Sequence, residues 1–182
     1  MSTFKTLRAA FGAAAATTAA SLLLTAAPAV AGQQMTVSFA ASPGSSAHFI
    51  MQHKAIRLHV AGDQSTAYAL VKVHHFPRTA PSAAPSFQAT YFSRGTPRWY
   101  IKFANGDYLF GFPPIGAWDA HTTTGGYDYG TYDEMLTYLR TQSGGTLPHV
   151  TKVQIIADGS AQRFPYTTEL SNVRYAGQNL TK

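Results

Sequence analysis

The chain contains no cysteine among its 182 residues. Catalysis by a thiol, zinc sites with cysteine ligands and disulfide bonds are therefore excluded. Acidic residues are also scarce, because 8 Asp and Glu stand against 14 Lys and Arg. The sequence has no G-x-S-x-G elbow, no phosphate-binding loop and no H-E-x-x-H motif, so the common signatures of catalysis are missing as well.

Long apolar runs are confined to the N-terminal region. Lys5 and Arg8 precede an Ala-rich apolar stretch that ends in small residues at Ala29 and Ala31, which is the pattern of a secretory signal peptide. After Gly32 no run approaches the roughly 20 apolar residues that a membrane-spanning helix needs. We therefore expect residues 1–31 to be removed and the protein to be secreted to the extracellular space without a membrane span. A retained membrane anchor is the alternative.

The mature chain would have 151 residues (182 minus 31), enough for one domain with a sizeable core. Losing Lys5 and Arg8 lowers the formal net charge from +6 to +4. The remaining basic residues form no run and no basic helix, which argues against a nucleic-acid partner. A moderate positive charge instead favours attraction to an anionic surface, such as a cell wall or an acidic polysaccharide.

The fold class follows from short alternating segments around a single helix. Residues 55–60, "AIRLHV", alternate apolar and polar side chains as a half-buried strand does, and further strand patterns occupy 67–76, 86–92, 149–158 and 167–177. Thr131 and Glu134 form a capping box that begins a helix, and Gly144 and Gly145 end it. We predict a mostly β protein, an antiparallel two-sheet β-sandwich of jelly-roll type, with one short helix near residues 131–142.

The sequence predicts one domain after a short lead-in. Residues 32–47 are small and polar and predict a flexible lead-in or an edge strand, and residues 48–182 predict a single β-sandwich domain. The proline-rich segment 77–86 is interpreted as a turn-rich connection, because the strands beside it are too short to form separate cores. An interdomain linker is the alternative for that segment.

The aromatic segment "RWYIKFANGDYLFGFPP", residues 98–114, predicts a hairpin around Asn105 and Gly106. A type I′ turn at this pair would set the register. The predicted cross-strand pairs are Trp99–Phe112, Ile101–Phe110, Phe103–Tyr108 and Ala104–Asp107. The first three pairs would share one apolar face, which is more often core than a ligand platform. Tyr100 and Lys102 would lie on the opposite, mixed face, toward solvent or a partner.

Residues 113–130, "PPIGAWDAHTTTGGYDYG", are longer than most structureless loops, which are usually functional beyond about 12–15 residues. The aromatic rings of this segment suit stacking on sugars, and its polar groups suit hydrogen bonds to hydroxyls. We predict an exposed ligand-binding loop here, although a loop that buries its own aromatics is the alternative. The candidate ligand-binding residues are Trp118, Asp119, His121, Tyr127, Asp128 and Tyr129.

Residues with metal-binding or catalytic chemistry occur, but not at the spacing that such sites use. His74 and His75 are adjacent, so on a strand they would point to opposite faces and could not jointly chelate a metal. Asp158 is a weak calcium candidate, but its Asp-Gly sequence is also ordinary turn chemistry. The acidic residues near the helix could include the carboxylate pair of a glycoside hydrolase, although helix dipoles favour such residues in a first turn. We assign no catalytic residue and expect no cofactor.

Several motifs occur in an order that resembles a group of small exported actinobacterial proteins. They are the aromatic hairpin, a Trp-containing segment, "GTYDEMLTYL", "VTKVQIIADGS" and "TTELSNVRYAGQNL", which together cover roughly residues 85–180. The ending also resembles the closing strands of jelly-roll carbohydrate-binding modules and galactose-binding-like domains. The resemblance implies a two-sheet sandwich. The sequence lacks the acidic calcium cluster of many such modules.

These observations favour a secreted, non-catalytic binding module for extracellular glycan or cell-wall polymer. A small secreted polysaccharide hydrolase or lyase is the first alternative. An extracellular protein-interaction or inhibitor domain is the second. The sequence leaves the oligomeric state and the identity of the ligand open.

Overall fold

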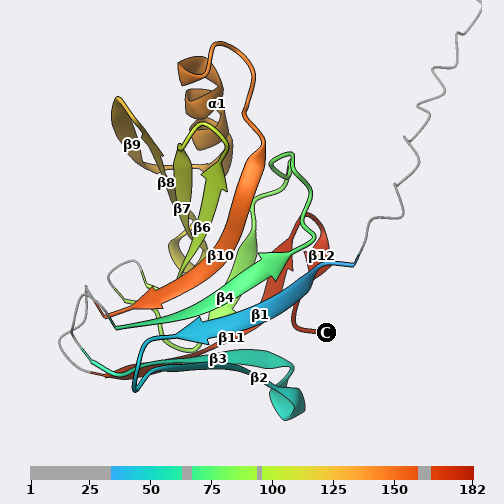
Figure 1. The fold of residues 1–182 in the computed structure, drawn as a ribbon, viewed down its shortest axis with the longest axis vertical. Coiled ribbons are helices and arrows are strands. Elements are labelled where there is room, and N and C mark those ends of the chain that lie inside the picture. The colour runs from blue at the N-terminus through green and yellow to red at the C-terminus, as the bar shows by residue number, and fades with distance from the viewer. Residues whose placement is uncertain (1–33, 63–66, 94–95, 160–164) are drawn as a thin grey trace, which may run out of the picture. The chain divides into compact units, whose positions relative to one another are not determined.

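The structure is a computed structural model that describes residues 34–62, 67–93, 96–159 and 165–182. The described residues form two antiparallel sheets and one α-helix, which confirms the predicted β-sandwich (Figure 1). The strands are β1 (Thr36–Ala41), β2 (Ser46–Ile50), β3 (Ala55–Val60), β4 (Tyr68–His74), β5 (Ser86–Ala89), β6 (Arg98–Phe103), β7 (Tyr108–Phe112), β8 (Ala117–Thr122), β9 (Gly125–Gly130), β10 (Val150–Asp158), β11 (Tyr166–Tyr175) and β12 (Gln178–Asn179). The helix is α1 (Tyr132–Gln142), and two short 3-10 helices are η1 (Met51–His53) and η2 (Pro113–Ile115).

The larger sheet has seven strands in the order β1-β4-β10-β6-β7-β8-β9. The second sheet has the order β12-β11-β3-β2, and β5 pairs with β11 beside it. β10 lies between β4 and β6, so segments far apart in the sequence are neighbours at the centre of the larger sheet (Figure 1). β1 and β9 are its two edges.

The core lies between the sheets and beneath the helix. Alternate residues of each strand point inward, so Val71 and Val73 of β4 and Ile155 of β10 join one buried cluster with Leu58 of β3. The inward face of β8 is covered by α1, whose buried residues include Met135 and Leu139. The other face of the seven-stranded sheet, which we call the outward face, carries half-buried and exposed side chains.

Helix α1 begins as predicted. The Thr131 side chain accepts a hydrogen bond from the Glu134 backbone N–H, and the Glu134 carboxylate accepts one from the Thr131 backbone N–H at 2.7 Å. This reciprocal pair is a capping box. The helix ends where Gly144 and Gly145 adopt positive φ, as the sequence predicted. Among the described residues, no helix combines the length and hydrophobicity needed to cross a membrane.

The β6–β7 hairpin is confirmed, but its predicted register is wrong by one residue. Asn105 does not have positive φ, whereas Gly106 does, at 96°. The Asn105 side-chain oxygen instead accepts a hydrogen bond from the Asp107 backbone N–H, which favours a three-residue loop over a type I′ turn. The observed pairs are Trp99–Gly111, Tyr100–Phe110, Ile101–Leu109 and Lys102–Tyr108. Tyr108 and Phe110 therefore leave the predicted core face and lie on the outward face.

The prediction that residues 113–130 form an exposed loop is also wrong. The segment contains η2, β8 and β9, and β8 pairs with β7 along its length. Trp118 and Ala120 are buried on the inward face, while Asp119 and His121 alternate with them on the outward face. This is period-2 patterning, which the surrounding Pro, Gly and Thr residues concealed. The predicted signal peptide, residues 1–31, lies outside the described residues and stays a prediction.

Candidate functional site

The outward face carries a group of aromatic side chains at the β6–β8 end of the seven-stranded sheet. Tyr100 lies opposite Phe110, and Tyr108 lies opposite both Lys102 on β6 and His121 on β8. The four rings are half-buried, so each presents part of its surface to solvent. We call them the aromatic row, and its members are Tyr100, Tyr108, Phe110 and His121.

The rings of the aromatic row pack on one another. The imidazole of His121 is stacked on Tyr108 with ring centroids 4.8 Å apart and planes 15° apart. Tyr108 and Phe110 meet edge to face at 5.2 Å, and Tyr100 lies 5.5 Å from Tyr108. Such pairs stabilise one another by about 0.5–1.5 kcal/mol beyond area burial, so the rings hold each other in a fixed arrangement.

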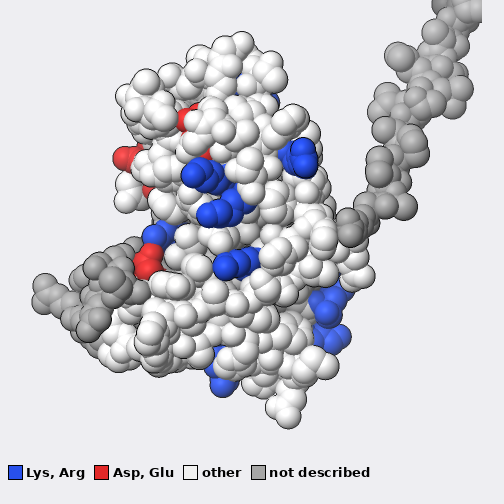
Figure 2. Space-filling model, viewed as in Figure 1, with Lys and Arg blue, Asp and Glu red and all other residues white. Residues whose placement is uncertain are grey.

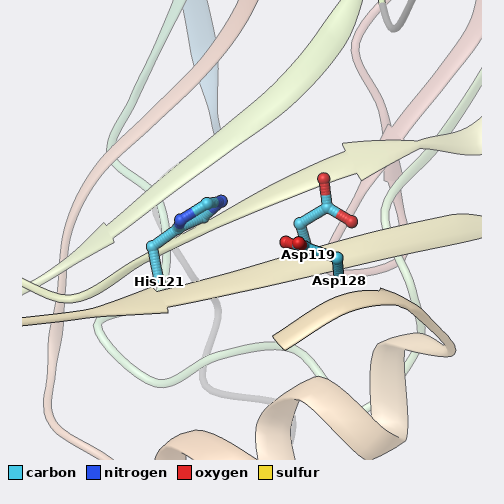
Figure 3. A group of neighbouring side chains, drawn as sticks. All are labelled: Asp119, His121 and Asp128. Carbon is cyan, nitrogen blue, oxygen red and sulfur yellow. The ribbon is translucent and has the colours of Figure 1, made fainter. Parts of the chain in front are cut away.

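Three polar side chains converge at the β8 end of the row. Asp119, His121 and Asp128 each offer one ligand atom, and these atoms lie within 4.8 Å of one another. Figure 3 shows the three side chains close to one another. All three were predicted as ligand-binding residues, and the structure brings them into one cluster, which we call the Asp–His–Asp cluster.

Two contacts orient this cluster. The Tyr129 backbone N–H donates a hydrogen bond of 2.8 Å to Asp119 Oδ1, and the stack on Tyr108 fixes the plane of the His121 ring. Tyr129 adopts positive φ, at 60°, next to a register shift between β8 and β9. The carboxylates and the imidazole can accept hydrogen bonds from ligand hydroxyls, and the same donor set suits a divalent cation.

Basic side chains lie on the same face. Arg98 places its guanidinium 4.7 Å from the Phe110 ring centroid, a cation–π contact at the margin of the aromatic row. Lys102 of β6 and Lys152 of β10 lie directly opposite each other, and Lys72 of β4 is one strand further along. Figure 2, in the same view as Figure 1, shows Lys and Arg side chains gathered over the middle of the larger sheet.

Trp118 does not belong to this site, contrary to the sequence prediction. Its side chain is 2% exposed and packs on Tyr132 of α1 with ring centroids 4.7 Å apart. It lies over Gly111, its cross-strand partner on β7. The reason is that pairing of β8 with β7 turns Trp118 inward, where the helix covers it. Trp118 is a core residue.

The two predicted tyrosines of β9 are exposed but do not join the aromatic row. Tyr127 is 45% exposed and contacts Tyr138 of α1 at 5.7 Å, on the helix side of the hairpin. The Tyr129 side chain is 79% exposed. The structure thus brings together the three polar candidates and separates the three aromatic candidates.

Asp158, the weak calcium candidate, has a different partner. Its carboxylate accepts a hydrogen bond from the Arg98 guanidinium at 2.5 Å, and the two form an ion pair. Within the part of the chain that the structure describes, the one group of three potential metal ligands is the Asp–His–Asp cluster. The Asp158 carboxylate is therefore engaged with Arg98, and calcium binding at this residue stays a prediction.

Sequence reasoning missed Tyr108 and Phe110, because the assumed turn placed them in the core. It noticed Tyr100 and Lys102 as the mixed side of the hairpin but attached no function to them. A three-residue turn at 104–106, in place of a two-residue turn at Asn105 and Gly106, would have placed both residues correctly, since it shifts the register by one residue. Lys152 could not be joined to Lys102 from the sequence, because their pairing is long-range.

Comparisons with models of known protein families, with curated proteins and with solved structures found no match for this chain. The function therefore has to be argued from the chemistry of the outward face.

Proposed function

We propose that the protein is a secreted, non-catalytic module that binds extracellular glycan or cell-wall polymer through the aromatic row. The observation that carries this proposal is the set of mutually packed, half-exposed rings on one face of the sheet. Aromatic faces stack on the apolar faces of sugar rings, and rigid rings lose little conformational entropy on binding.

Hydrogen-bonding groups surround the rings. The Tyr100 hydroxyl is protonated at physiological pH, as in an ordinary tyrosine, and can donate a hydrogen bond. Burial, and to a smaller extent the neighbouring Tyr108, raise its pKa further. Asp119 lies directly opposite Phe110 on β8 and supplies an acceptor. A sugar ring stacked on the row would find donors and acceptors at its edges, which gives orientation as well as affinity.

The placement of the row also favours a polymer. Its members come from three adjacent strands, so a ligand that covers all four rings runs across the strands. Strands are about 4.8 Å apart, and the row therefore extends over roughly two strand spacings, near 10 Å. A chain of sugars can continue past the row in both directions along the sheet face.

The proposal is tested with the purified protein on a panel of immobilised neutral and acidic polysaccharides. Tyr108→Ala and Phe110→Ala should each weaken retention at least tenfold, because they remove stacking surface. Tyr127→Ala, an exposed tyrosine outside the row, is the matched control and should retain the glycan as the unmodified protein does. Retention by the row variants equal to that of the control would contradict the proposed site.

The same incubation distinguishes a binding module from an enzyme. Products are scored as new reducing ends or unsaturated ends. Retention without products supports the proposal, whereas products that disappear in Asp119→Asn or Asp128→Asn would replace it with a hydrolase or lyase. No retention on any glycan would contradict glycan binding altogether.

A further inference from the structure

Lys102 and Lys152 form a directly opposed cross-strand pair on the outward face. Side chains in this relation have Cβ atoms about 5 Å apart, and like charges placed so are destabilising. Neither lysine has an acidic partner among the described residues, where Glu169 pairs with Arg57 and hydrogen-bonds His53, and Asp158 pairs with Arg98. The central strands of the larger sheet thus place two lysines side by side without a carboxylate that balances their charge.

A third lysine extends this positive region. Lys72 of β4 lies opposite Gln154 of β10, which in turn lies opposite Tyr100 of β6. Lys72 likewise has no acidic partner among the described residues. The three lysines occupy adjacent strands and are half-buried or exposed. We call Lys72, Lys102 and Lys152 the lysine group.

The described acidic side chains of the outward face do not pair with the lysine group. Asp158 pairs with Arg98, and Asp119 and Asp128 lie at the opposite end of the aromatic row, on β8 and β9. Along the sheet the order is therefore carboxylates, aromatic rings, then lysines. The lysine group adjoins the rings directly, because Lys102 is the cross-strand neighbour of Tyr108.

We infer that the polymer bound by this face is anionic, with carboxylate or phosphate groups that meet the lysine group while a neighbouring sugar stacks on the aromatic row. This inference rests on the proposed glycan-binding function and names the class of glycan. An anionic group placed between Lys102 and Lys152 can pair with both ammonium groups, which have no carboxylate partner among the described residues.

Stacking rings beside lysines also suit single-stranded nucleic acid. The expected export of the protein and the absence of a basic run in the sequence favour an extracellular polysaccharide instead. Single-stranded DNA is therefore an outcome of the test and not a second proposal.

The test compares two forms of one polymer. Polygalacturonic acid carries a carboxylate on every sugar, and its fully methyl-esterified form has the same backbone without charge. We expect at least tenfold tighter binding of the charged form at low salt, with the difference shrinking as sodium chloride is added. Dextran phosphate compared with unmodified dextran tests phosphate in place of carboxylate while both polymers keep their sugar rings, and a preference for either charged polymer over its uncharged form supports the inference.

The variant that tests the site is Lys102→Gln/Lys152→Gln, and it should lose the preference for the charged form. Lys54→Gln/Lys182→Gln removes the same charge away from the seven-stranded sheet and should keep that preference. Circular dichroism checks that both variants remain folded. Equal binding of each charged polymer and its uncharged form, in both arms, would overturn this inference and leave glycan binding standing.

Two further outcomes are decisive. Tighter binding of an oligothymidylate than of any anionic glycan would overturn the choice of a polysaccharide. A charge preference undiminished in Lys102→Gln/Lys152→Gln would overturn the lysine group as its origin. Absence of binding to every glycan would overturn both this inference and the proposed function.

Discussion

The indole ring of Trp118 lies over Gly111, its cross-strand partner, so closely that a β-carbon on residue 111 would be 2.3 Å from Trp118 Cη2. Gly111 is also the cross-strand partner of Trp99 on the other side. Both indoles are buried, with exposures of 0% for Trp99 and 2% for Trp118. A residue without a side chain between them is therefore what allows two large rings to share the inward face of adjacent strands.

We expect Gly111→Ala to destabilise the protein. The added methyl group must displace a buried indole ring, and overpacking of this kind typically costs about 1–3 kcal/mol. Gly62→Ala is the control, because nothing lies within 4 Å of a β-carbon at that position and its backbone does not require glycine. Chemical denaturation of both variants measures the effect, and equal stability of the two would show that the indole can move aside.

Trp118→Ala should reduce the free energy of unfolding by about 3–5 kcal/mol, because it empties a buried site between β7 and α1. Tyr129→Ala, at an exposed position 79% accessible to solvent, should change stability by no more than about 0.5 kcal/mol. Thermal or chemical unfolding measures both. An unfolding curve of Trp118→Ala that matches that of the unmodified protein would contradict the buried position of Trp118.

The capping box should make part of the stability depend on acid pH. The Thr131 backbone N–H, and then its hydroxyl, hydrogen-bond the Glu134 carboxylate and lower its pKa below the ordinary value of 4.5. A lowered pKa contributes stability above the unfolded-state pKa, and this contribution is lost as the pH falls through the folded-state value. The stability advantage over Glu134→Gln should therefore be present at pH 6 and shrink below about pH 4.5.

Asp133→Asn is the matched variant, because it removes a first-turn carboxylate outside the capping box. Thermal unfolding between pH 3 and pH 7 compares the three proteins. Identical pH profiles for Glu134→Gln and the unmodified protein would mean that the Glu134 pKa is the same in the folded and unfolded chains.

Tyr175→Phe should leave stability unchanged or raise it by about 1 kcal/mol. The Tyr175 hydroxyl is buried and makes no hydrogen bond with any described residue, while its ring packs on Trp99 at 5.8 Å. Burial also raises the pKa of Tyr175 above 10 in the folded protein. Above about pH 10 the tyrosine therefore ionises more readily in the unfolded chain, which lowers the free energy of unfolding of the unmodified protein. The advantage of Tyr175→Phe should accordingly grow above pH 10.

Tyr166→Phe provides the contrast, because the Tyr166 hydroxyl hydrogen-bonds Thr96 Oγ1 at 2.8 Å. That variant leaves Thr96, which is also buried, without this partner and should be destabilised. Denaturation at pH 7 decides between them. Loss of stability in Tyr175→Phe as large as in Tyr166→Phe would indicate a hydrogen bond to the Tyr175 hydroxyl.

Local signals were sufficient for much of the fold. The alternation of residues 55–60 predicted β3, and the capping box predicted the first residue of α1, because both depend on neighbours within a few positions. The turn between β6 and β7 was harder, since its type depends on the Asn105–Asp107 hydrogen bond as well as on the Asn-Gly pair. The burial of Trp118 depends on Gly111 of another strand, which no local pattern reveals.

In the candidate site too, the residue types could be recognised from the local sequence, whereas their arrangement depends on long-range pairing. Asp119, His121 and Asp128 could be selected by residue type, but their convergence follows from the pairing of β8 with β9. The lysine group spans β4, β6 and β10, whose adjacency arises from the order of the sheet and not from the order of the sequence. Charge patterns across such strands become visible only when the register is known.

The three-residue turn between β6 and β7 has a consequence for how this protein tolerates change. Side chains in the hairpin alternate between core and surface, so the loop length decides that Trp99 is buried and Tyr100 is not. Deleting one turn residue would offer the chain the alternative pairing, in which Tyr108 and Phe110 compete for the interior. A one-residue insertion or deletion at this tip would therefore exchange the buried aromatic rings and those on the outward face. Such a change should disturb both stability and binding more than replacing any single ring.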